Sequence, residues 1–200
     1  MRGIFKKFVG LVCVVSLLLT TTQRSCFQIP EEQPLPQVAV VTKTLYVDSS
    51  FSFSEKSCIR KAANTWNKKT NGLAQIIVKE VAGPEDVPEE FSPDHVVMNQ
   101  LTSRSTAVFI LDKMGGGRIF GFYSNGESVS QIYLIADRLK EPTFCKIVVT
   151  HEIGHALGLE HSGKIGTLMY EDVIGMSNGI TTDDLREFCK KYGCELKERM

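Results

Sequence analysis

Residues 151–161 read HEIGHALGLEH and contain three of the four histidines in this 200-residue chain. On a helix, residues four apart project from the same face, so we expect His151 and His155 to lie side by side, one turn apart. Two neutral imidazoles held in this way can share one zinc ion, at Zn–N distances of about 2.0–2.1 Å. Glycine adopts the left-handed backbone conformation readily, so Gly158 can end the helix and turn the chain back toward the metal. We therefore expect His161 to supply the third ligand.

Glu152 directly follows the first of these histidines and need not bind the metal itself. Bound zinc lowers the pKa of its water ligand to about 7, and a nearby carboxylate can then take a proton from that water during attack on a carbonyl group. The same carboxylate could pass the proton to the leaving amine. We therefore predict zinc-dependent hydrolysis of peptide bonds, with Glu152 as the general base and no covalent intermediate.

The stretch resembles the HExxHxxGxxH motif of the metzincins, which are zinc-dependent endopeptidases, at every specified position. These proteases also have a methionine-containing turn beneath the metal, and GTLMY (166–170) looks like that Met-turn, with Met169 in this role. Within the clan the chain is most similar to the matrixins, through Ser162 after the third histidine, LMY in the turn and the closing TTDDLREFCKKYG (181–193). The resemblance extends over residues 42–193. It implies an α+β fold with a twisted mixed β-sheet, an active-site helix, a Met-turn and a C-terminal helix.

The resemblance also implies how a substrate would bind. An edge strand would line the cleft and pair with an extended peptide. Residues 118–124 begin at the last residue of the glycine-rich stretch MGGGR (114–118) and stand where matrixins have this strand. We therefore expect this segment to be the edge strand.

The chain departs from the matrixin pattern in its metal-binding residues and near its substrate pocket. Matrixins usually carry a second, structural zinc, but outside the motif only His95 remains, so we predict no structural zinc and expect His95 to be a surface loop residue. Calcium is a less favoured cofactor than zinc, because Asp112 and Asp137 are the only obvious carboxylates near the expected loops. Glu171 and Asp172 stand where matrixins typically have a proline, so the resemblance does not define specificity.

The N-terminus has the pattern of a signal peptide. Three basic residues precede an apolar run of twelve (8–19), which is too short to span a bilayer but fits the hydrophobic region of an export signal. We therefore predict a signal peptide at residues 1–25, a proline-containing linker at 26–41 and the catalytic domain at 42–200. The alternative is a buried helix or an uncleaved anchor.

QRSC (23–26) also resembles the end of a bacterial lipoprotein signal, in which Cys26 would become the lipidated N-terminus. The protein would then be lipid-anchored rather than freely secreted or periplasmic. With Cys13 in the apolar run and Cys26 near the cleavage zone, four cysteines remain that could form two disulfides in an oxidising compartment, with three pairings open. They are Cys58, Cys145, Cys189 and Cys194. Free buried thiols are the alternative.

Hydrophobic periodicity and turn residues predict the other elements. We expect strands at residues 42–47, 73–81, 106–111, 118–124 and 131–136, and a loop at 83–94. We expect three helices, one capped by Ser52 and closed by Asn71-Gly72, one beginning near Pro142, and one capped by Thr181 and stopped by Gly193. The first of these helices has an apolar face that we assign to the core, made of Ile59, Ala62, Ala63 and Trp66.

Charge and composition limit the partners. Lysine plus arginine equals aspartate plus glutamate, at 23 each, so no strong field attracts nucleic acid or an anionic membrane. We expect a protein or peptide substrate, no nucleic acid, membrane contact only through a lipid at Cys26, and a monomer. Two other functions remain open, a non-catalytic peptide-binding protein that retains the zinc site and a metal-dependent hydrolase of a non-peptide bond.

Overall fold

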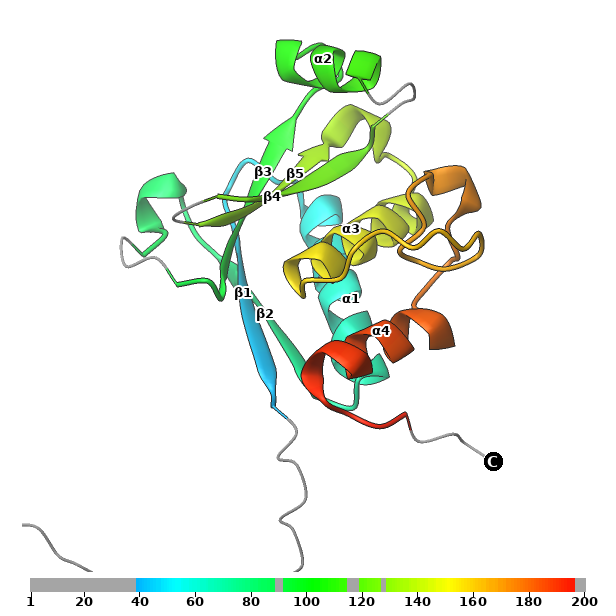
Figure 1. Cartoon of the computed structure of the whole chain (residues 1–200). Helices are drawn as coiled ribbons and strands as arrows, with labels where there is room; N and C mark the ends of the chain where they lie inside the picture. The colour runs from blue at the N-terminus through cyan, green and yellow to red at the C-terminus, as the bar shows by residue number, and fades with distance from the viewer. Residues whose placement is uncertain (1–38, 89–91, 115–118, 127–128, 197–200) are drawn as a thin grey trace, which may run out of the picture. The chain divides into compact units, whose positions relative to one another are not determined.

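Five strands form one mixed sheet in the order β2-β1-β3-β5-β4 (Figure 1). The computed structural model describes residues 39–88, 92–114, 119–126 and 129–196, so the predicted signal peptide and nearly all of the predicted linker lie outside the described residues. The strands are β1 (Val41–Val47), β2 (Ala74–Glu80), β3 (His95–Leu101), β4 (Gly121–Asn125) and β5 (Ser130–Ile135). Neighbouring strands are parallel except β4, which runs antiparallel to β5 at one edge of the sheet. The expected edge strand is thus confirmed as β4.

Four α-helices accompany the sheet within the described part of the chain. They are α1 (Phe53–Lys69), α2 (Thr106–Met114), α3 (Pro142–Ala156) and α4 (Thr182–Tyr192). Short 3-10 turns lie at η1 (Pro84–Asp86), η2 (Ala136–Arg138) and η3 (Val173–Gly175). Figure 1 shows α1 and α3 on the same face of the sheet, with α4 packed beyond them. This arrangement is the predicted α+β fold.

The predicted helix caps are confirmed. Ser52 begins α1 with a capping box in which its side chain and that of Glu55 each accept from the other residue's backbone N–H. Thr181 begins α4 with the same arrangement, and Gly193 ends α4 in the left-handed conformation, at φ 70°. Asn71 also adopts a positive φ, as expected for the turn that follows α1.

Trp66 connects the first helix to the active-site helix. Its side chain is fully buried, and the indole N–H donates a hydrogen bond to the backbone carbonyl of Thr150 in α3 at 2.8 Å. The ring also lies 6.2 Å from the ring of Phe188 in α4. The predicted core role of Trp66 is therefore confirmed, and its N–H helps to position the segment that carries the histidines.

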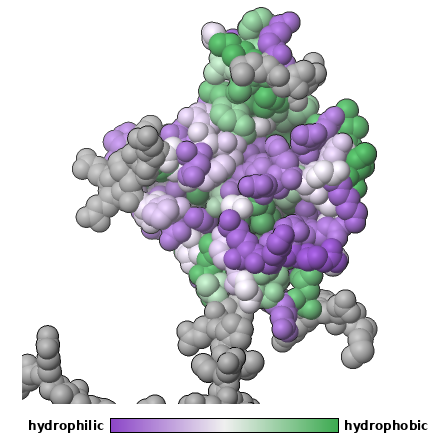
Figure 2. Space-filling view, viewed as in Figure 1, coloured by the Kyte–Doolittle hydropathy of each residue, from purple (hydrophilic) through white to green (hydrophobic). Residues whose placement is uncertain are grey.

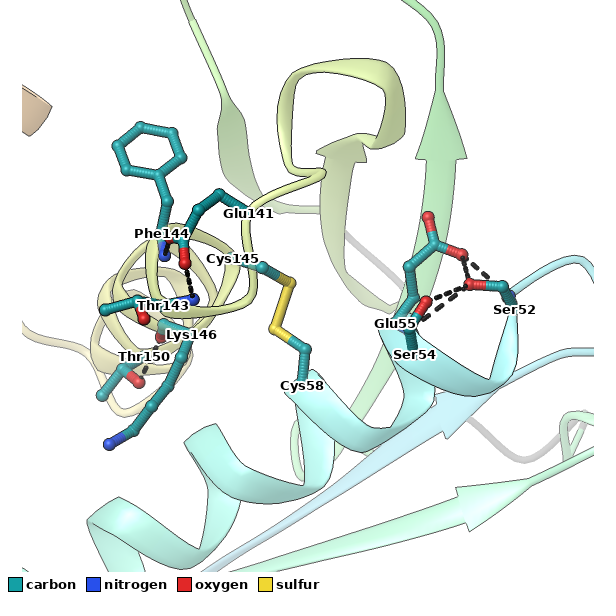
Figure 3. The surroundings of a disulfide bond; sticks show 10 residues. All are labelled: Ser52, Ser54, Glu55, Cys58, Glu141, Thr143, Phe144, Cys145, Lys146 and Thr150. Atoms are coloured by element: carbon teal, nitrogen blue, oxygen red, sulfur yellow. Dashed lines mark hydrogen bonds between the residues drawn. A yellow bond between two sulfur atoms is a disulfide. The ribbon is translucent and has the colours of Figure 1, made fainter.

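Both disulfides are formed among the four predicted cysteines. Cys58 of α1 pairs with Cys145 of α3, so a covalent link joins the first helix to the active-site helix near its N-terminus (Figure 3). Cys189 of α4 pairs with Cys194, only five residues further along the chain. The free-thiol alternative is therefore wrong for this structure.

The predicted strand at 106–111 is wrong, because these residues form α2. Five apolar residues in a row (107–111) carry no periodicity that separates a strand from a helix. In the helix Val108 is fully buried, whereas Phe109 and Ile110 are 60% and 49% exposed. These side chains contribute to the apolar surface over α2 at the top of Figure 2.

Strand β3 was not predicted. Its sequence, HVVMNQL, alternates only over its first half, where Val96 and Met98 are buried, and its second half contains two amides, Asn99 and Gln100. Position alone makes it a central strand, since β1 pairs with it on one side and β5 on the other. His95 is therefore not a loop residue. It begins β3, is half-buried, and its ring contacts Tyr46 edge-on, with 5.2 Å between ring centroids.

No helix among the described residues is both long enough and apolar enough to cross a membrane.

Candidate metal centre

Helix α3 places two of the three motif histidines on the face that meets the Met-turn. Glu141 caps the helix by accepting from the backbone N–H groups of Thr143 and Phe144, and Pro142 occupies its first turn (Figure 3). Almost every residue from the middle of α3 to its end is buried, because the helix is enclosed by the sheet, α1 and the Met-turn. His151 is only 3% exposed. His151 and His155 are therefore held on a well-packed helix.

The three histidines converge on one point. The Nε2 atom of His155 lies 3.0 Å from that of His151 and 3.1 Å from that of His161. Two nitrogens that bind the same tetrahedral zinc ion at 2.0–2.1 Å are about 3.3 Å apart. The observed separations are close to this value, so the donor set fits zinc.

Backbone carbonyl groups fix which ring nitrogen faces the centre. Nδ1 of His151 lies 2.8 Å from the carbonyl oxygen of Leu168, and Nδ1 of His155 lies 2.8 Å from that of Leu159. A carbonyl only accepts hydrogen bonds, so each Nδ1 carries the proton and each Nε2 presents a lone pair. Lone pairs that face each other at 3 Å repel unless a cation lies between them, which again fits a metal ion.

Burial favours the neutral imidazole at His151 and His155. It lowers the pKa of His151 to about 4, with smaller contributions from the other two histidines, and it also lowers the pKa of His155. Only the neutral ring can bind a metal, so the enclosure favours the binding form at neutral pH.

Gly158 ends the active-site helix in the manner predicted. Its φ is +73°, in the left-handed region, and its N–H bonds the carbonyl of His155 at 2.7 Å. The chain then reverses, so that His161 meets the two histidines of α3 although the helix has stopped at Ala156. A residue with a β-carbon would be strained at this turn.

Met169 lies beneath the histidines and touches the helix at a glycine. A β-carbon placed on Gly154 would lie 2.4 Å from Sδ of Met169, which no real contact allows. Met169 is 2% exposed. The glycine between the two helical histidines was not identified from the sequence, because its role appears only once the Met-turn is packed against α3.

Asp184 in α4 supports the Met-turn from the other side and was also missed. Its carboxylate is 3% exposed and accepts hydrogen bonds from the backbone N–H groups of Leu168 and Met169 at 3.0 and 3.1 Å. Leu168 is the residue whose carbonyl holds His151. A continuous path of contacts thus runs from α4 through the turn to a motif histidine. The only local signal for Asp184 is its position three residues after Thr181, which is the spacing of the observed capping box and does not indicate contact with the Met-turn.

Replacing Asp184 by asparagine should loosen this turn. An amide cannot accept hydrogen bonds with both of its terminal atoms, so a buried backbone N–H loses its partner and the free energy of unfolding should fall by about 1–3 kcal/mol. Urea denaturation of the metal-free protein would measure this change.

Asp183→Asn is the matched control. The side chain of Asp183 is more exposed than that of Asp184 and pairs with Lys164 and Arg186 near the surface, where such pairs are worth about 1 kcal/mol or less. Equal losses in the free energy of unfolding in the two variants would contradict the role of Asp184 in supporting the Met-turn.

Glu152 is buried beside the three histidines. It is 4% exposed, its Oε2 has no hydrogen-bond partner among the described residues, and burial raises its pKa to about 8. Strand β4 approaches it at Gly121, where a β-carbon would lie 3.3 Å from Oε1 of Glu152. The carboxyl group is therefore enclosed between α3 and β4 with an oxygen left free to exchange a proton.

The histidine triad is the only group of three or more potential metal ligands that the described residues form. The two aspartates considered for calcium are engaged elsewhere. Asp112 binds the guanidinium of Arg138 and the backbone N–H of Ile119, and Asp137 accepts from Ser103. Calcium binding stays a prediction from the sequence.

Comparison with known proteins places the chain in a family. The family model for matrixins matches residues 60–193, which include the last part of α1, all of α3 with the histidine motif, and α4. The chain belongs to the matrixin family. The fold and the family of this matrixin are those of zinc metallopeptidases.

Among solved structures, this matrixin is similar to archaemetzincin from Methanopyrus kandleri, with a TM-score of 0.51 and 12% identity over 76% of this chain and 96% of that one. It is also similar to a zinc-dependent peptidase from Methanocorpusculum labreanum, with a TM-score of 0.46 and 11% identity over 72% of this chain and 98% of that one. No curated protein sequence matches significantly. At such identities the first likeness shows the fold alone, which confirms the metzincin-like architecture expected from the sequence.

Proposed function

We propose that this matrixin is an endopeptidase that hydrolyses peptide bonds with one zinc ion held by His151, His155 and His161. The observation that carries the proposal is the convergence of three Nε2 atoms beside a buried glutamate. When bound, zinc supplies a water ligand of pKa about 7 and polarises the carbonyl group under attack.

Glu152 is the residue that we propose as general base. Its pKa of about 8 lies close to neutral pH, where a carboxylate can both take and release a proton. It accepts the proton of the attacking water and then delivers it to the nitrogen of the leaving amine. The other buried carboxylate among the described residues is Asp184, and both of its oxygens already accept hydrogen bonds from the Met-turn, so we assign both proton transfers to Glu152.

Strand β4 is the surface that we propose for the substrate. The sheet has two edges, and the other edge is covered in its middle, because the side-chain amide of Asn67 bonds both the N–H and the carbonyl of Ile76 in β2. No described side chain bonds the backbone of β4 in this way. An extended peptide could therefore pair with β4 and pass directly over the histidines.

Metal removal tests the proposal. We expect the purified protein to cleave members of an internally quenched peptide library, to lose this activity in a zinc chelator, and to regain it when zinc is added. A metal-free protein that cleaves at full rate would overturn the zinc mechanism. A zinc-loaded protein that retains peptides but cleaves none would instead indicate the non-catalytic peptide-binding alternative.

We also propose that this matrixin acts outside the reducing cytosol, as a monomer, after export by its N-terminal segment. The two disulfides support this location, since disulfides persist mainly in oxidising compartments. Mass spectrometry of the mature N-terminus would distinguish simple cleavage after about residue 25 from lipid attachment at Cys26, and either result supports export. An intact N-terminus on protein found in the cytosol would contradict it.

A further inference from the structure

On the face of β4 that points toward α3, a different residue lies over each of two α3 residues. Side chains two apart on a strand share one face. Gly121 lies over Glu152, and the next inward residue, Tyr123, lies over His155. The rings of Tyr123 and His155 are nearly parallel, with an interplanar angle of 21° and 6.3 Å between centroids. Strand β4 therefore places no side chain beside Glu152 and an aromatic ring beside His155.

A hydrogen bond fixes the hydroxyl end of the Tyr123 ring. Its hydroxyl lies 2.9 Å from Oγ of Ser130, the buried first residue of β5. Ser130 donates its own proton to the side-chain oxygen of Asn125 at 3.3 Å, so it accepts from the tyrosine. The ring cannot turn away from His155 without losing this bond.

Of the two helical histidines, His155 is the one that needs such support. His151 is almost fully buried, so packing restrains its ring from all sides, whereas His155 is only partly buried. The hydrogen bond from Nδ1 of His155 to Leu159 holds one atom of the ring but leaves the ring free to tilt about that contact. A fixed aromatic face alongside limits the tilt.

We propose that Tyr123 is a positioning residue of the metal centre, which keeps the His155 imidazole in the plane where its Nε2 meets those of His151 and His161. This inference rests on the proposed zinc site. Groups that orient a metal ligand without touching the metal commonly change metal affinity by 10–100-fold when they are removed.

Zinc affinity, measured by competition with a chromophoric chelator, tests this role without any peptidase assay. Tyr123→Leu should weaken zinc binding by about 10-fold or more. Tyr123→Phe keeps the ring but loses the hydroxyl, and Ser130→Ala removes the anchor alone, so both should weaken zinc binding by less than Tyr123→Leu does. If the leucine variant does not fold, a measurable loss of affinity in these two milder variants supports the role, and unchanged affinity overturns it.

Tyr133→Leu is the matched control. Tyr133 lies on the neighbouring strand and stacks on Phe122, with 4.7 Å between centroids, on the face of the sheet away from α3. Its loss should leave zinc affinity unchanged, and an equal loss in both leucine variants would overturn a specific role for Tyr123. Unchanged zinc affinity in Tyr123→Leu with a raised KM would also overturn it, since the tyrosine would then contact the substrate instead.

The zinc-binding measurements also distinguish failure of the Tyr123 role from failure of the proposed zinc site. If the unmodified protein binds zinc and cleaves peptides but Tyr123→Leu binds zinc equally well, only the positioning role fails. If the unmodified protein binds no zinc, the proposed metal centre fails and the positioning role fails with it.

Discussion

Replacing Glu152 by glutamine should slow peptide hydrolysis by about 10²–10⁴-fold while zinc stays bound. Glutamine has nearly the same shape, so it should fit between α3 and β4, but its amide cannot accept the proton of the attacking water. The measurement is kcat at saturating zinc, together with the zinc content of the purified variant. Unchanged kcat would show that Glu152 is not the general base.

The same substitution should stabilise the metal-free protein at neutral pH. Burial raises the pKa of Glu152 to about 8 from a usual value of 4.5, so the folded state binds a proton that the unfolded state has released. Folding stability is therefore lost as pH rises from about 4.5 to about 8, and glutamine, which has no proton to release, avoids this loss. The depressed pKa of His151 acts in the opposite direction, below pH 6.5, and is common to both proteins.

Thermal unfolding of the two metal-free proteins across this pH range would measure the effect. The gap in melting temperature should widen in favour of the glutamine variant up to about pH 8 and then stay constant. Glu160→Gln is the control, because it makes the same chemical change at an exposed position and should leave kcat unchanged. A constant gap between Glu152→Gln and the unmodified protein would contradict the raised pKa.

Removing the Cys58–Cys145 disulfide should cause the largest loss of stability. The bond closes a loop with a sequence separation of 87, for which chain-entropy arguments give about 4–5 kcal/mol. A domain of this size is typically stable by only about 5–15 kcal/mol. The double variant Cys58→Ala/Cys145→Ala should therefore unfold at much lower urea concentration. It should also bind zinc more weakly under conditions where part of it is unfolded.

The second disulfide is a control within the same chain. Cys189–Cys194 closes a loop with a separation of 5, so its removal should cost about 2 kcal/mol and leave the active-site helix in place. Urea unfolding of both double variants, with and without a dithiol reductant, gives the comparison. Equal losses for the two disulfides would contradict the loop-length argument and the anchoring of α3 through Cys145.

Local sequence patterns predicted the helix caps but not every helix and strand. The caps of α1 and α4 were predictable, because Ser52, Thr181 and Gly193 act within a few residues of themselves. The apolar run at 106–111 was assigned to the wrong element, since nothing local distinguishes a short buried strand from a helix with one buried residue. Strand β3 was missed for the converse reason, because its identity comes from its two neighbours in the sheet.

By itself, the sequence determined the part of the site contained in residues 151–161. The i, i+4 spacing of two histidines, a glycine able to reverse the chain and a third histidine three residues later are local features, governed by helix geometry and backbone freedom. The tertiary structure alone decided what surrounds that stretch. It brought Asp184 under the Met-turn, paired Cys58 with Cys145, and set Gly121 and Tyr123 over α3. These contacts join segments far apart in the chain, and their physical origin is the burial of one shared core, which no local spacing encodes.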